Sequence, residues 1–74
     1  MLELRFVNDL THEVIDSSWA VSDSQIGLAP LPGETLTLRI GDKKENFKVT
    51  GRHWNLDHKN VYDTRIDIYI EHVH

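Results

Sequence analysis

The chain has 74 residues, of which 39% are hydrophobic and 27% are charged, and its formal net charge is -4 with the histidines counted as neutral. A chain of this length buries only about 60% of the surface that its unfolded form exposes, so residues 1–74 have room for a single domain with one modest core. The absence of cysteine excludes disulfide bonds and thiolate metal sites. No apolar run approaches the roughly 20 residues of a membrane helix, and we expect a cytoplasmic protein without membrane contact.

The charge is unevenly distributed along the chain. Residues 1–38 carry one base against six acids, whereas residues 39–65 carry seven bases against four acids. A fold can place these two segments on different faces, and an acidic region can steer association with a basic partner. The acidic total is atypical of proteins that coat nucleic acids, which are generally basic.

In the first half of the chain, the sequence predicts a strand, an ambiguous segment and a loop. Apolar residues alternate with charged ones over residues 2–6, which predicts a strand. Residues 12–18 fit either a short helix capped by Thr11 or a strand favoured by the β-branched Val14. The pattern dissolves over residues 19–33, where serine, glycine and proline argue against a long helix and predict one long irregular loop.

In the second half, alternation with a period of two is the dominant pattern. Residues 35–54 are predicted to form a hairpin around a polar turn at residues 41–46. Gly51 interrupts the second strand of this hairpin, and a glycine in such a position often marks a bulge. A bulge shifts the register, so Trp54 rather than His53 is expected to point toward the core.

The last predicted strand is the clearest. Over residues 64–71, Ile66, Ile68 and Ile70 share one side, which indicates a half-buried strand. A polar connection over residues 55–63 precedes it. Four or five short strands joined by turns predict a mainly β fold, either a small barrel or a curled antiparallel sheet, because a flat open sheet of this size leaves an apolar face in water.

The sequence Leu-Pro-Gly-Glu-Thr-Leu-Thr-Leu, from Leu31 to Leu38, points to a known architecture. Followed by Phe47-Lys48-Val49 and a final alternating strand, it resembles the Pro-Gly-Glu strand opening of SH3-like small barrels. The resemblance covers residues 31–71 and concerns architecture only. It implies a small SH3-like barrel, and such barrels bind proteins, peptides and nucleic acids alike. No functional motif of the family can be carried over onto individual positions.

No constellation in the sequence predicts catalysis or a cofactor. The serines of residues 17–24 lack a glycine-flanked nucleophile elbow, and the carboxylates are dispersed. His72 and His74 lie two residues apart on one side of a strand, and His53 and His58 lie five apart around a turn. Neither spacing matches a strong zinc motif. We therefore expect a protein that is not an enzyme, with no metal site and with its histidines at the surface.

The leading functional hypothesis is a binding module that docks on another protein, in the role of a phage-type inhibitor or an adaptor. Tryptophan is enriched in binding hot spots, and Trp19 begins an irregular loop that is long for so small a chain. The opposing interpretation places Trp19 as a plug in one mouth of the barrel and Trp54 in its core. The residues predicted for protein binding are Trp19, Val21, Asp23, Ile26 and Leu28.

Two other modes of association remain open. If residues 35–40, 47–54 and 64–71 form a meander, their outward side chains give a basic sheet face that can bind RNA or single-stranded DNA. The residues predicted for this face are Arg39, Lys48, Arg52, Arg65 and Tyr69. The strand over residues 64–72 can also pair edge to edge with a second copy if it is left uncovered, which predicts a homo-oligomer.

Overall fold

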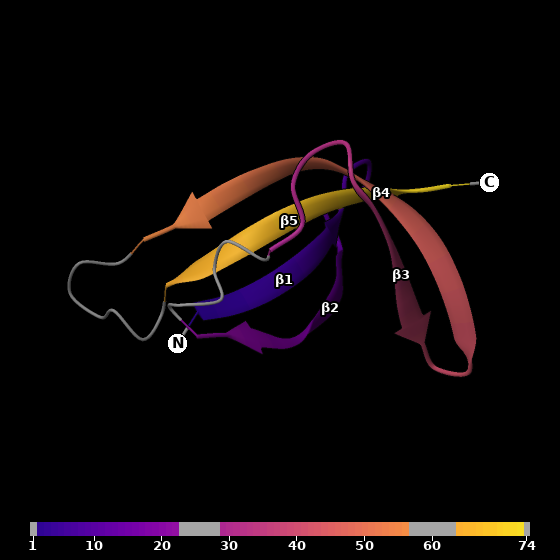
Figure 1. The fold of residues 1–74 in the computed structure, drawn as a ribbon, viewed down its shortest axis with the longest axis horizontal. Coiled ribbons are helices and arrows are strands. Elements are labelled where there is room, and N and C mark those ends of the chain that lie inside the picture. The colour runs from indigo at the N-terminus through magenta and orange to yellow at the C-terminus, as the bar shows by residue number, and fades with distance from the viewer. Residues whose placement is uncertain (1, 23–28, 57–63, 74) are drawn as a thin grey trace.

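The computed structural model describes residues 2–22, 29–56 and 64–73, without the side chains of Leu2, Ser18 and Val21 (Figure 1). Every regular element in these ranges is a β-strand, and the described residues contain no helix able to span a membrane. The mainly β fold is therefore confirmed. The strands are β1 (Leu2–Asn8), β2 (Val14–Val21), β3 (Thr35–Ile40), β4 (Lys43–Asn55) and β5 (Arg65–His72).

The five strands form one sheet in the order β2-β1-β5-β4-β3. The sheet curls into a half-barrel, in which β4 arches over β5 and the β3–β4 hairpin bends down at one end (Figure 1). Its pairings are not all antiparallel, because β1 and β5 run parallel, with Leu4 opposite Ile66. The sheet is mixed because the chain crosses from β2 at one edge to β3 at the other before it returns to the centre.

The central strand, β5, separates two faces of the sheet. Its residues Ile66, Ile68 and Ile70 are fully buried on the face inside the curl, here called the inner face. Strand alternation directs Asp67 and Tyr69 to the opposite, outer face. The core cluster against the inner face comprises Leu4, Phe6, Ala29, Leu38, Phe47, Val49, Ile66, Ile68 and Ile70.

Because β5 pairs with β1 on one side and with β4 on the other, it has no free edge. The condition for edge-to-edge association through residues 64–72 is therefore not met, and a homo-oligomer stays a prediction. Among the described strands, β2 and β3 are the outermost.

The predicted hairpin over residues 35–54 is confirmed, and so is its bulge. β3 and β4 pair antiparallel, and the register between β4 and β5 shifts just before Gly51. As a result, Trp54 lies opposite Ile66 on the inner face, and His53 points to the outer face. The predicted orientation of these two side chains is correct.

The ambiguous early segment is a strand, and it is longer than the sequence pattern indicates. β2 extends to Val21 and pairs antiparallel with β1, with register shifts on either side of Phe6. Trp19 therefore lies in a strand, opposite Leu4, and not in the predicted loop. The consecutive serines of this segment give no clear local signal for a strand. The strand forms because pairing with β1 supplies backbone hydrogen-bond partners and apolar neighbours.

We expect Ile68→Ala to destabilise the fold by about 2–5 kcal/mol, because it opens a cavity beneath the central strand. The matched control is Ile40→Ala at the end of β3, where 38% of the side chain is exposed, and it should lose far less. Urea unfolding measures both free energies. Equal losses in the two variants would contradict this placement of the core.

Candidate binding surfaces

A row of four side chains crosses the inner face from β2 to β4. Trp19 of β2 lies opposite Leu4 of β1. Leu4 in turn lies opposite Ile66 of β5, which lies opposite Trp54 of β4. The two middle residues are core residues, whereas Trp19 is 51% exposed and Trp54 is 42% exposed. Each end of the row is thus a large aromatic side chain that the fold covers only in part.

The neighbouring row on the inner face ends in two charged residues, Asp16 on β2 and Arg52 on β4. Each charge contacts the tryptophan beside it. Trp19 Nε1 donates a hydrogen bond of 3.0 Å to Asp16 Oδ2, and the guanidinium carbon of Arg52 lies 5.3 Å from the centre of the Trp54 ring. We call these four residues, Asp16, Trp19, Arg52 and Trp54, the tryptophan rim.

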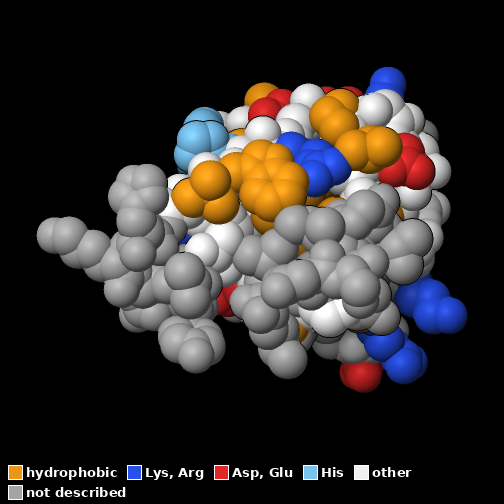
Figure 2. All heavy atoms as spheres, turned by 60° about the vertical axis from the view of Figure 1, so that its left-hand side comes forward, with side chains coloured by type: hydrophobic (Ala, Val, Ile, Leu, Met, Phe, Trp, Pro, Cys, Tyr) orange, Lys and Arg blue, Asp and Glu red, His pale blue; other side chains and the backbone are white. Residues whose placement is uncertain are grey.

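Arg52 is held in place without being neutralised by the described part of the chain. Its Nε atom is buried and has no hydrogen-bond partner, which costs about 1–3 kcal/mol. The cation–π contact with Trp54 offsets about 0.5–2 kcal/mol of this. Figure 2 looks at the end of the molecule where β4 finishes and shows hydrophobic side chains gathered around a cationic one. Arg52 is therefore positioned against Trp54, and its Nε has no acceptor among the described residues.

The structure places two of the five residues predicted for protein binding. Trp19 and Val21 both lie in β2. Asp23, Ile26 and Leu28 lie outside the described residues. Trp54, which the opposing interpretation places in the core, points to the inner face but is not a member of the core cluster.

On the outer face, a buried carboxylate joins three strands. Arg5 Nε donates a hydrogen bond of 2.8 Å to Asp67 Oδ1, and Asn55 Nδ2 donates one of 2.8 Å to Asp67 Oδ2. Arg65 Nε lies 3.7 Å from Asp67 Oδ1. Burial raises the pKa of Asp67, but these hydrogen bonds and the two arginine charges together outweigh it and leave the pKa below its ordinary value. The hydrogen bond to Asp67 also raises the pKa of Arg5.

The residues predicted for nucleic-acid binding do not all share one face. The outer face carries four of the five, namely Arg39, Lys48, Arg65 and Tyr69. Arg52 lies opposite Ile68 on the inner face, because the bulge before Gly51 reverses the alternation along the rest of β4. The register shift that turns Trp54 inward turns Arg52 inward as well, which simple alternation missed.

The pairing of each tryptophan with a charge was not predicted from the sequence. For Arg52 and Trp54 a signal was present, since residues two apart in a strand share a face. For Asp16 and Trp19 there was none, because their contact spans a register shift in β2. Among the residues that the structure describes, no three histidine, aspartate or glutamate side chains are grouped to hold a metal ion.

Comparison with known proteins does not assign this chain to a family. No protein-family model matches it, and neither a curated protein nor a solved structure matches it.

We expect Asp67→Asn to lower the free energy of unfolding at neutral pH by about 1–3 kcal/mol, because the variant loses charge-assisted hydrogen bonds. The native pKa of Asp67 is lowered, so its stabilisation is complete above the pKa of the unfolded chain, about 3.9. This stabilisation is lost as the pH falls through the native pKa. The difference between wild type and variant should therefore shrink below about pH 4.

Urea unfolding at a series of pH values measures this difference. Glu71→Gln, at an exposed carboxylate of the same strand, is the matched control and should stay close to wild type throughout. A difference between wild type and Asp67→Asn that does not change with pH would contradict the role of the ionised carboxylate.

Proposed function

We propose that this chain is a non-catalytic module that docks on another protein through the tryptophan rim. The observation that carries the proposal is the row from Trp19 to Trp54, in which a half-exposed indole stands at each end of a buried apolar pair. Tryptophans in this state offer a large area that a partner can cover at little entropic cost.

The two indoles are fixed at a defined separation. Three strand spacings separate β2 from β4 in the sheet, which is about 14 Å measured along its surface. Both side chains are anchored, Trp19 through Asp16 and Trp54 through Arg52. A surface that is ordered before binding loses less entropy when the partner docks.

The charged members of the rim orient the partner. Asp16 and Arg52 lie at opposite ends of their row, so a partner docked the wrong way round would place like charges together. Because no described acid forms an ion pair with Arg52, the proposed partner carries an acidic group that lies beside Trp54. The overall charge of -4 still favours encounter with a protein that is basic elsewhere.

Other parts of this proposal are supported by the sequence alone. They are the role as an inhibitor or an adaptor, the cytoplasmic location, and the assignment of the half-barrel to the SH3-like class. A curled five-stranded sheet is compatible with that class.

The test compares proteins captured by the full chain and by matched variants. Trp19→Ala and Trp54→Ala should lose a protein that wild type and Leu10→Ala retain, since Leu10 is exposed in the β1–β2 turn outside the rim. With that protein purified, each tryptophan substitution should weaken binding by at least about 2 kcal/mol, or about 30-fold in Kd. Calorimetry measures the affinity.

Circular dichroism and urea unfolding establish that each variant is folded before capture. Arg52→Lys keeps the charge but loses the planar stacking surface, and it should bind with an affinity between those of wild type and Trp54→Ala. Equal retention of every captured protein by both tryptophan variants would remove the rim as the docking surface.

One observation favours a second candidate function, the binding of RNA or single-stranded DNA, and three oppose it. Arg39, Lys48 and Arg65 share the outer face. However, Arg65 is paired with Asp67, Lys48 lies opposite Glu71, and the ring of Tyr69 already makes an edge contact with that of His12, with 6.1 Å between the ring centres.

We therefore expect a fluorescently labelled single strand to show no saturable binding in low salt. Fluorescence anisotropy at low and at physiological salt measures it, and Arg39→Ala serves as the comparison. Binding that weakens steeply with salt and depends on Arg39 would establish phosphate contacts and favour the second candidate over the first.

A further inference from the structure

The two free edges of the half-barrel differ in regularity. β2 carries register shifts at two points of its pairing with β1, and bulges of this kind blunt an edge against further pairing. β3 pairs with β4 without a shift from Thr35, opposite Lys48, to Ile40, opposite Lys43. Only β3 therefore presents a regular edge, and none of the described strands covers it.

The hydrogen bonds that precede β3 show which of its backbone groups point away from the sheet. Val49 N donates to Glu34 O at 2.8 Å, so the carbonyl of Glu34 points toward β4. Because this direction alternates along an antiparallel strand, the N–H and C=O groups of Thr35, Thr37 and Arg39 point outward. All three residues are exposed.

The outer face of the β3–β4 hairpin is cationic. Arg39 lies directly opposite Lys44, and like charges in such a pair destabilise a sheet unless a counter-charge lies near them. The hairpin's own Glu45 is on the inner face, where its Oε2 is 3.9 Å from His72 Nε2. On the outer face, the acidic Glu71 lies opposite Lys48 and not opposite the pair of Arg39 and Lys44.

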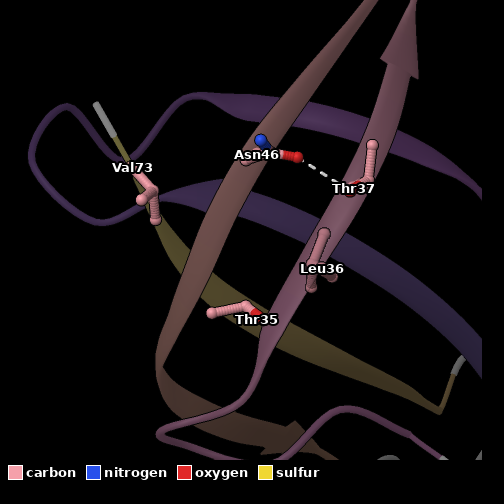
Figure 3. Close-up of a pocket in the computed structure, with 5 residues that line it drawn as sticks. All are labelled: Thr35, Leu36, Thr37, Asn46 and Val73. Atoms are coloured by element: carbon pink, nitrogen blue, oxygen red, sulfur yellow. Dashed lines mark hydrogen bonds between the residues drawn. The ribbon is translucent and has the colours of Figure 1, made fainter.

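Next to these cations, the outer face is hollowed and polar. Thr37 Oγ1 donates a hydrogen bond of 2.8 Å to Asn46 Oδ1. Thr35 and Val73 also line this hollow of about 490 Å³, with Val73 on the far side of β4 (Figure 3). On the inner face, the partly buried Leu36 and the exposed Ile40 give the same edge an apolar side.

We propose that β3 accepts an extended segment of an acidic protein as a sixth strand. The outward backbone N–H and C=O groups of Thr35, Thr37 and Arg39 form hydrogen bonds with the segment. Its alternate side chains are acidic on the outer face, beside Arg39 and Lys44, and apolar on the inner face, beside Leu36 and Ile40. Strand addition of this kind takes affinity from main-chain bonds and specificity from alternate side chains.

Charge decides between this occupant and two others. A second copy paired through β3 would bring two identical cationic hairpins together, which is unfavourable. A nucleic-acid strand would meet only three outward cations on the hairpin, Arg39, Lys44 and Lys48, and Lys48 lies opposite the acidic Glu71. Nucleic acid also has no peptide backbone to form strand hydrogen bonds with the outward N–H and C=O groups of β3.

The test uses the full chain and two synthetic peptides of alternating sequence, one of glutamate and valine and one of lysine and valine, flanked by proline to prevent self-association. Fluorescence anisotropy in low salt should detect binding of the glutamate peptide only. Thr37→Pro removes one outward N–H and should weaken binding at least about tenfold, whereas Thr37→Val keeps that N–H and should bind like wild type. Arg39→Glu should reverse the preference between the two peptides.

A measurement on the peptide keeps the test independent of how well the variants fold. Two N-methylated forms of the glutamate peptide are compared, one methylated at its odd positions and one at its even positions. Only one of the two should lose binding, because only one set of N–H groups faces β3. Trp54→Ala should bind the peptide with the affinity of wild type. A loss of docking through the tryptophan rim can therefore be distinguished from a loss of strand addition at β3. Equal binding of both peptides, equal effects of both methylation phases, or binding of a single-stranded oligonucleotide in their place would each overturn the proposal.

Discussion

Alternation along β5 places apolar side chains on one face of this strand and a buried carboxylate on the other. The positions of the other strands follow from this arrangement. Three isoleucines face inward and are fully buried, each contributing about 1.5–3 kcal/mol, while Asp67 faces outward into a cage of hydrogen-bond donors. A slip of one residue would carry the carboxylate into the core and the isoleucines into water. Both faces therefore select the same register, which is a strong constraint in a chain with so small a core.

The register of β5 is transmitted to its neighbours from both sides. Arg5 on β1 and Asn55 on β4 reach the same carboxylate, so Asp67 ties together two strands that do not pair with each other. With β1 and β4 fixed, the row through Leu4 and Ile66 is fixed as well, and the tryptophans at its ends acquire defined positions. The positions of the rim residues are thus a consequence of the core and of the outer-face network.

The features that the sequence predicts are those set by residues close together in the chain, and the features that it does not predict depend on contacts between distant residues. The hairpin over residues 35–54 and the strand with the three isoleucines follow from local alternation. The parallel pairing of β1 with β5 does not, because it joins the two ends of the chain and leaves no local signal. In the candidate site, Trp19 lies in β2 and not in the predicted loop. Arg52 lies on the inner face and not on the predicted outer face, because the bulge at Gly51 turns both Arg52 and Trp54 inward.

The asymmetry of the two edges bears on why the half-barrel stays open. A closed barrel would remove both edges, but β2 is blunted by its bulges while β3 stays regular. For a domain of this size, a strand that binds the native edge and not the unfolded chain adds stability that grows with the ratio of its concentration to its Kd. Recognition at β3 and completion of the fold are in that case one process, and an acidic segment beside Arg39 and Lys44 relieves the like-charge pair that the isolated hairpin retains.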